Sequence, residues 1–265
     1  MKKITSKQIF AFDMDGTLTN SRLDKVSDEV RKSLRELKKN GLDVVILSSG
    51  SIDRLYNQIE DVDLHIIGNY GYTEADIIGG RLVNNKTNLT SREVDEQEVA
   101  SKVDHFRLLT GNTDVQGKSY IINKYGMVIV PLPGNELSND ARNYYDPEGT
   151  KRRQFVDQLQ SEFPDSNVYI CGKTSYDIVD KDINKYTALK RYCDNTNRTL
   201  DDVMFFGDEF DNKDGNDYCL KENGVEGINV SSPNEICKLI DIVVDNIYNR
   251  EHNAIIDGFD NVAEM

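Results

Sequence analysis

Short apolar runs alternate with amphipathic segments in this chain, and that alternation limits its fold more than any other feature. Buried strands are predicted at Gln8–Phe12, Leu42–Leu47 and His65–Gly68. Apolar residues recur at spacings of three and four between Val26 and Lys39, which predicts an amphipathic helix, and a second helix is expected from about Ile52 to Ile59. Because strands that alternate with helices form parallel sheets, the sequence indicates an α/β core.

The pattern changes after this first part of the chain. A hairpin with a glycine pair at its turn is predicted at Tyr72–Val83. Beyond it we expect helices at Val94–Leu109 and Thr150–Phe163, apolar strands within Ser119–Val130, and a strand at Asn167–Val179. This mixture indicates antiparallel strands with two helices, which is a separate α+β unit.

The parallel pattern returns at Lys185, with a helix, a strand at Val203–Phe206 and a late strand near Ile228–Val230. The simplest architecture is an α/β fold with a Rossmann-like parallel-sheet core and an inserted α+β cap domain. We predict that residues 1–84 and 185–265 form the core and that residues 85–184 form the cap. The last stretch, residues 247–265, has the composition of a surface helix or a frayed end.

The strongest chemical motif is Asp13–Thr19, which comes directly after a predicted buried strand. Asp13 can attack a phosphoryl group, and Asp15 can act as general acid and base on the leaving or entering oxygen. Gly16 permits a tight turn and Thr17 can hold the loop through its hydroxyl group. The alternatives are an acidic turn or a calcium loop, but Leu18–Lys25 lacks the spaced oxygen ligands that a calcium loop requires.

A second acidic segment follows the strand that ends near Phe206. It contains Asp208 and Asp217. Oxygen atoms are the ligands that Mg²⁺ prefers, and the carboxyl ends of parallel strands meet at one edge of a sheet. We therefore predict a Mg²⁺ site formed by Asp13, Asp15, Asp208 and Asp217, with Asp15 contributing through a main-chain carbonyl. Alone this segment is an acidic loop; paired with the first motif it is far more specific.

Two smaller features lie between these motifs. Ser49 follows the second predicted strand and can offer its hydroxyl group to phosphate oxygens. Lys185 can neutralise Asp13 and a phosphoryl group in transfer. Either residue alone is more often an ordinary strand-end serine or surface lysine. Their order along the chain favours catalytic roles for both.

The formal net charge of −14 makes polyanions poor partners, so we expect neither nucleic acid nor a membrane surface to bind. No apolar run approaches the ~20 residues that span a bilayer. The four cysteines match no zinc spacing and no export signal is evident, so a cytoplasmic location is expected. Any phosphate site on so acidic a chain must be made locally positive by metal, lysine, arginine or backbone NH groups.

In chain order, the Asp13 motif, Ser49, Lys185 and the Asp208 segment resemble the four motifs of the haloacid dehalogenase superfamily. A cap inserted after the third strand resembles the branch that contains sugar phosphatases and phosphomannomutases. Within the predicted cap, Ser119–Met127 and Gly172–Ile178 are similar to stretches of the eukaryotic-type phosphomannomutases, as is the loop Gly207–Asp217. That loop is one residue longer than the family pattern.

The resemblance implies substrate-binding roles that nothing else in the sequence requires. Arg22 and Arg142 match arginines that bind the sugar phosphate in that family, and Ser175 and Asp177 match a serine and an aspartate that contact the sugar. Lys124 stands where the family has arginine, and Asn135 stands where a further arginine is expected. The alternative for isolated charged residues is a solvated polar face. Asp177 fits that alternative poorly, because it is flanked by apolar residues in a predicted strand.

The resemblance implies a phosphomannomutase-like enzyme that interconverts mannose 1-phosphate and mannose 6-phosphate through an aspartyl-phosphate. It also implies Mg²⁺, a hexose 1,6-bisphosphate activator, a sugar phosphate as the small-molecule substrate, and a homodimer formed through the cap. A sugar-phosphate phosphatase on the same scaffold is the main alternative, since the weakened cap charge suits an enzyme with no second phosphate to hold. A non-catalytic binding protein ranks lowest, because every core catalytic position is present.

Overall fold

The computed structural model describes residues 7–247, and its larger sheet has seven strands in the order β11-β10-β1-β2-β3-β4-β5. The parallel strands of this sheet are β1 (Ile9–Phe12), β2 (Asp43–Leu47), β3 (Leu64–Gly68), β10 (Val203–Gly207) and β11 (Gly227–Asn229). Because β1 lies between β2 and β10, the chain segments that follow β1 and β10 leave the sheet side by side.

The predicted hairpin forms and extends this sheet at one edge. Strand β4 (Thr73–Ile78) pairs antiparallel with β3, and β5 (Arg81–Thr87) pairs antiparallel with β4. Gly79 and Gly80 make the turn with φ values of 57° and 71°, a region that favours glycine. Strand β5 continues to Thr87, so the larger sheet includes three residues beyond position 84.

Helices cover both faces of the larger sheet, which explains why its strands are continuous apolar runs. Phe10 and Phe12 pack on one face with α1 (Asp28–Lys39), α2 (Ile52–Ile59) and a last helix over residues 233–247. Ile9 and Ala11 point to the other face, towards α7 (Lys185–Asn195) and α8 (Tyr218–Glu222).

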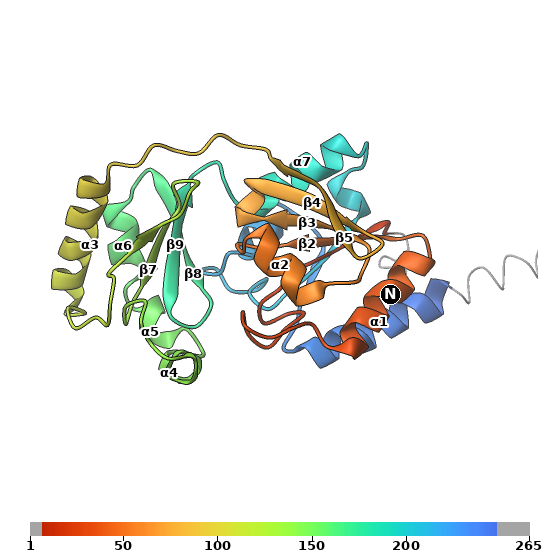
Figure 1. Cartoon of the computed structure of the whole chain (residues 1–265), viewed down its shortest axis with the longest axis horizontal. Helices are drawn as coiled ribbons and strands as arrows, with labels where there is room; N and C mark the ends of the chain where they lie inside the picture. Colours follow the sequence, from red (N-terminus) through yellow and green to blue (C-terminus); the bar gives the residue numbers. More distant parts are fainter. Residues whose placement is uncertain (1–6, 248–265) are drawn as a thin grey trace, which may run out of the picture.

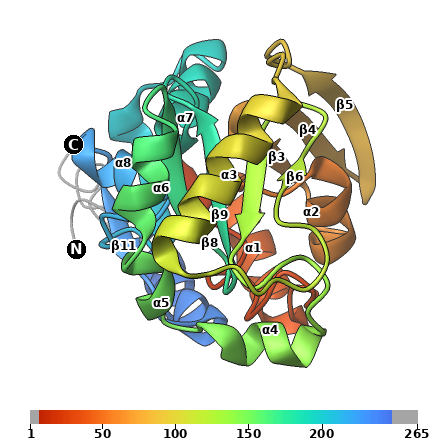
Figure 2. The ribbon, with the colours of Figure 1, turned by 90° about the vertical axis from the view of Figure 1, so that its left-hand side faces the viewer.

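The second sheet forms a separate lobe (Figure 1). Its order is β6-β7-β9-β8, with β6 (Ile121–Ile122), β7 (Val128–Pro131), β8 (Ser166–Cys171) and β9 (Ser175–Asp180) all antiparallel. Helices α3 (Glu96–Thr110) and α6 (Val156–Glu162) cross its outer face in Figure 2. The opposite face turns towards the larger sheet, with a small cluster that includes Tyr70, Tyr72 and Val179 at the junction.

Three elements of this lobe differ from the sequence prediction. The single strand expected at Asn167–Val179 is the hairpin β8–β9, because the chain reverses at Gly172, whose φ is 54°. The single helix expected at Thr150–Phe163 is divided into α5 (Thr150–Arg153) and α6. At the break the Arg152 carbonyl accepts from the Phe155 amide (3.0 Å), three residues further on, and from the Tyr176 hydroxyl (2.7 Å). Helix α4 (Asn139–Tyr145), capped by Ser138, was not predicted.

The chain passes between lobes twice, between β5 and α3 and between β9 and α7 (Figure 1). The cap boundaries at residues 84/85 and 184/185 stay a prediction. The surface helix or frayed end expected at residues 247–265 lies outside the described residues after position 247. Among residues 7–247, none of the helices is both long enough and apolar enough to cross a bilayer.

Candidate active site

Lys185 lies at the centre of the site and is completely buried. Its Nζ donates to Oδ1 of Asp13 and to Oδ1 of Asp217, each at 2.5 Å. Asp13 directly follows β1, Asp217 directly precedes α8, and Lys185 is the first residue of α7. The Asn184 side chain caps α7 by accepting from the Thr187 amide (2.9 Å), so the helix start holds the lysine in place.

Asp208 joins this group from the end of β10. Asp13, Asp208 and Asp217 each offer an oxygen within 4.8 Å of the others. Burial raises the pKa of Asp13 to about 7; the charge of Lys185 opposes this and that of Asp217 adds to it. Burial and the charges of Asp13 and Asp217 raise the pKa of Asp208 to about 9. Three crowded carboxylates beside one lysine therefore leave an excess of negative charge.

The donor set fits a divalent cation. All of these ligand atoms are carboxylate oxygens, which hard cations such as Mg²⁺ prefer. Oδ2 of Asp217 is buried and has no hydrogen-bond partner within the described residues, a costly arrangement for a carboxylate unless a cation or water meets it. The carboxylate of Asp15 lies outside this group, so the predicted contribution of Asp15 through its main-chain carbonyl stays a prediction.

The two acidic motifs are tied together by the turn at Gly16 and Thr17. The buried Thr17 hydroxyl accepts from the Asp208 amide at 3.0 Å. Gly16 has a φ of 95°, and a Cβ on it would lie 2.1 Å from Oδ2 of Asp208. Glycine is therefore required both for the turn and for the close approach of the Asp208 carboxylate.

Asp15 points to a partner that the sequence prediction missed. Nη1 of Arg54 donates to Oδ1 of Asp15 (2.8 Å) and to Oε1 of Gln58 (3.0 Å). A Cβ on Gly50 would lie 2.0 Å from Nη2 of Arg54, so the loop after β2 leaves room for the guanidinium group. One feature of the sequence could have indicated this partner: Arg54 lies in the first turn of the helix that follows the Ser49 loop.

The cap contributes Asp177 from β9. Tyr176 and Ile178 pack under the cap helices, so by strand alternation Asp177 and Ser175 face the larger sheet. Asp177 is 5% exposed, and its Oδ2 accepts from the Tyr70 hydroxyl at 3.0 Å. Burial raises the pKa of Asp177, although hydrogen bonds from Cys171 and Tyr70 and the charges of Arg22 and Arg54 work against this.

Ser49 and Cys171 bring the two lobes into contact at the same place. The Ser49 hydroxyl lies 3.4 Å from the Cys171 thiol. Burial and the charge of Asp177 hold the pKa of that thiol well above its usual range, so it is un-ionised. Ser49 of the core thus lies next to Cys171 of the cap. Asp177 of the cap contacts Tyr70 and is influenced by the charge of Arg22.

The remaining predicted cap residues make local contacts in the part of the chain that is described. Arg142 donates to the main-chain carbonyls of Leu137 (3.0 Å) and Asn135. Nζ of Lys124 lies 5.0 Å from the centroid of the Tyr125 ring, and the Ser175 hydroxyl lies 3.3 Å from that of Thr174. The Asn135 side chain accepts from the Lys118 amide at 2.7 Å. None of these contacts reaches Asp13 or Lys185.

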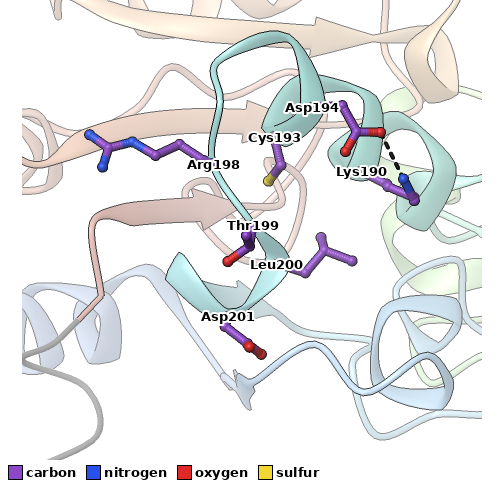
Figure 3. Close-up of a pocket in the computed structure, with 7 residues that line it drawn as sticks. All are labelled: Lys190, Cys193, Asp194, Arg198, Thr199, Leu200 and Asp201. Carbon is purple, nitrogen blue, oxygen red and sulfur yellow. Dashed lines mark hydrogen bonds and ion pairs between the residues drawn. The ribbon is translucent and has the colours of Figure 1, made fainter.

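A pocket is formed by the end of α7 and the segment that follows it (Figure 3). Its lining residues are Lys190, Cys193, Asp194, Arg198, Thr199, Leu200 and Asp201. The Lys190 ammonium is paired with Asp194 at 2.7 Å. No predicted site residue lines this pocket, so it has no part in the chemistry considered below.

Sequence comparison defines the class of protein. A family model of haloacid dehalogenase-like hydrolases matches residues 10–220, which include Asp13, Ser49, Lys185 and Asp208. The chain therefore belongs to the haloacid dehalogenase-like hydrolases, a family of enzymes. This membership confirms the superfamily resemblance, and the two-lobed architecture confirms a Rossmann-like core with an inserted cap.

Individual relatives are more specific. A phosphomannomutase of Saccharomyces cerevisiae is 29% identical over 240 residues, covering 86% of this chain and 91% of that protein. Among solved structures, an IMP-bound IMP-nucleotidase of Plasmodium falciparum has a TM-score of 0.66 at 14% identity, covering 92% of this chain and 70% of that one. A sugar phosphatase of haloacid dehalogenase subclass IIB has a TM-score of 0.54 at 15% identity, covering 88% and 91%. At such identities the two structures establish the fold alone.

Proposed function

We propose that this enzyme is a Mg²⁺-dependent phosphotransferase that acts on hexose phosphates through an aspartyl-phosphate on Asp13. The observation that carries the proposal is the buried Lys185, paired with Asp13 and Asp217 beside Asp208. A lysine and a cation site at one carboxylate are suited to stabilising a phosphoryl group in transfer. The similarity to phosphomannomutases supports a sugar phosphate as the substrate.

The chemistry needs a nucleophile and an acid–base group. An oxygen of Asp13 forms a bond to phosphorus while the bond from phosphorus to the sugar oxygen breaks, and Asp15 gives its proton to that leaving oxygen. In the second half, Asp15 takes a proton from the attacking hydroxyl group as the aspartyl-phosphate is cleaved. Lys185 neutralises charge on Asp13 throughout, and Ser49 can donate to a phosphate oxygen.

The cation would be held by Asp13, Asp208, Asp217 and the main-chain carbonyl of Asp15. When bound, Mg²⁺ offsets the negative charge that the carboxylates and the phosphoryl group bring together. This role is consistent with the raised pKa values of Asp13 and Asp208, because burial, to which neighbouring carboxylates add, disfavours their charged forms and a cation would favour them.

The proposed reaction is phosphomannomutase-like, with mannose 1-phosphate and mannose 6-phosphate as the substrate pair. A hexose 1,6-bisphosphate would maintain the phosphorylated enzyme, and closure of the cap would exclude water from the acyl phosphate. Arg22, Lys124, Arg142, Ser175 and Asp177 are the proposed sugar-phosphate contacts. The cytoplasmic location expected from the sequence stays a prediction.

A sugar-phosphate phosphatase is the second candidate, and the cap favours it. Asn135 brings no charge where the mutase family has arginine, and Arg142 already donates to the carbonyls of its own loop. A phosphatase needs to hold only the phosphate that it removes. A mutase must also hold the second phosphate of a bisphosphate intermediate, so weak cap charge matters more to it.

Product analysis separates the two candidates. Mannose 1-phosphate would be incubated with the enzyme and Mg²⁺, with and without glucose 1,6-bisphosphate, and the products identified by NMR. We expect mannose 6-phosphate, formed at least about 10-fold faster with the bisphosphate because phosphoenzyme lost to water must be restored. Inorganic phosphate without isomer would establish the phosphatase. No turnover of any phosphate ester would contradict both candidates.

A further inference from the structure

A buried tyrosine joins the cap to the core beside the site. Tyr70 lies in the short turn η2 (Asn69–Gly71) between β3 and β4, and it is 1% exposed. Its backbone adopts φ 55° and ψ 26°, and Asn69 before it has φ 51°. Non-glycine residues rarely adopt this left-handed region, and such conformations concentrate where function requires a particular side-chain direction.

The Tyr70 hydroxyl makes two hydrogen bonds, one to each lobe. Nδ2 of Asn216 donates to the hydroxyl oxygen at 3.1 Å, and the hydroxyl donates to Oδ2 of Asp177 at 3.0 Å. An amide nitrogen only donates and a carboxylate only accepts, so the direction of this chain of hydrogen bonds is determined. Because Asn216 directly precedes Asp217, these hydrogen bonds connect Asp177 of the cap to the segment whose Asp217 accepts from Lys185.

Two further contacts join the same surfaces. The ring of Tyr70 stacks on that of Tyr169 in β8, with centroids 5.8 Å apart and planes 20° apart. The main-chain amide of Ile170 donates to the carbonyl of Asp214 at 3.1 Å. The cap strand β8 is therefore bound directly to the acidic loop between Asp208 and Asp217. The hydrogen bonds of the Tyr70 hydroxyl join the cap to the same loop.

We propose that Tyr70 is a positioning residue, which orients the Asp177 carboxylate for the sugar and couples docking of the cap to the loop that carries Asp217. Its strained backbone aims the ring at the cap, and its hydroxyl group touches both Asn216 and Asp177. The role in sugar binding rests on the proposed function; the coupling of cap and loop does not.

The test variant is Tyr70→Phe, which retains the ring stacking and removes both hydrogen bonds. Tyr72→Phe is the matched control: Tyr72 is also 1% exposed, belongs to the same cluster and stacks on Tyr125 of the cap at 5.2 Å. For Tyr70→Phe we expect kcat/KM on hexose phosphates to fall about 10-fold or more, the usual effect of losing a hydrogen bond to a charged group. On p-nitrophenyl phosphate, which has no sugar for Asp177 to contact, we expect a change of less than about 3-fold.

Hydrogen exchange gives a readout that does not depend on the substrate. We expect faster exchange at the Ile170 amide and across residues 208–217 in Tyr70→Phe but not in Tyr72→Phe. Unchanged exchange would overturn the coupling, and equal kinetic losses on both substrates, or none on hexose phosphates, would overturn the positioning role. A wild-type enzyme that is inactive on hexose phosphates yet shows the exchange effect would contradict the proposed substrate and retain the coupling.

Discussion

At the scale of single residues, the site depends on one buried ammonium group. Burial by itself lowers the pKa of Lys185. The charges of Asp13 and Asp217 and their hydrogen bonds raise it by more, so the net shift is upward and the lysine stays protonated. An isolated lysine in this position would lose its proton, and removing one partner of a buried pair costs about 3–5 kcal/mol. The network therefore maintains both the charge and the position of the lysine.

Replacing Asp13 by asparagine tests the nucleophile. Asn retains the shape and can still accept from Lys185, but it cannot form an acyl phosphate, so we expect turnover to fall by at least about 10³-fold with little change in fold. Steady-state kinetics and a thermal melt measure the two effects. Phosphatase or mutase activity that disappears in this variant also rules out a non-catalytic binding protein, whereas full activity would remove Asp13 from its role.

Asp208→Asn provides the comparison for the metal site. We expect it to raise the Mg²⁺ concentration for half-maximal activity by about 10-fold or more, because one anionic ligand is lost while the nucleophile is intact. An unchanged Mg²⁺ requirement would place the cation elsewhere.

At the scale of elements, the edge hairpin contains a buried acid. Glu74 of β4 is 4% exposed and forms an ion pair with Lys86 of β5 at 2.5 Å, while Nε2 of His65 on β3 lies 3.7 Å away. Burial by itself raises the pKa of Glu74, but the neighbouring His65, Lys86 and Asn88 outweigh it and lower the pKa to about 2. Glu74 thus places its charge between Lys86 of the hairpin and His65 of β3.

This pKa shift predicts how acid affects stability. The folded pKa of Glu74 is lower than the usual value of 4.5, so its contribution is complete above about pH 5 and disappears as the pH falls towards 2. We expect the free energy of unfolding of the wild type to decrease over that range by on the order of 1 kcal/mol more than that of Glu74→Gln, after allowing for the solvent exposure of Lys86. Urea titrations at pH 6, 4 and 3 measure the difference, and parallel curves would contradict it.

At the scale of the whole molecule, the cap exposes several large apolar side chains. Leu108 and Leu109, near the end of α3, are 72% and 61% exposed, and Ile121 of the edge strand β6 is 36% exposed. Isolated exposed leucines are ordinary, but an adjacent pair on a lobe with an unpaired edge strand suits a protein contact. These residues suit the homodimer through the cap that the family resemblance implies, which stays a prediction.

Charged substitutions test that dimer. We expect Leu108→Asp combined with Leu109→Asp to convert a dimer to a monomer in analytical ultracentrifugation, because burying two carboxylates in an interface is costly. Ile78→Asp is the control, since Ile78 is 58% exposed on the edge hairpin of the core and should leave the dimer intact. A monomeric wild type, or a double variant that sediments like wild type, would contradict the prediction.

Local patterns of the sequence predicted much of the fold. The buried strands before Asp13 and Asp208, the helix that begins at Lys185 and the glycine turn at Gly79 are each set by residues close together in the chain. Division of the helix at Arg152 was missed, and one partner of the Arg152 carbonyl at the break, the Tyr176 hydroxyl, lies in another element. Helix α4 was missed since it is short and has no buried residues.

The sequence alone predicted which groups lie together at the candidate site, because strand ends place Asp13, Ser49 and Asp208 at one edge of a parallel sheet, whatever the side-chain details. Only the tertiary structure decided their partners. Arg54 reaches Asp15 across 39 positions, and Tyr70 reaches Asp177 across 107. The physical reason is that periodicity reports which face of an element is buried, whereas a hydrogen bond between lobes depends on how two separately folded surfaces meet.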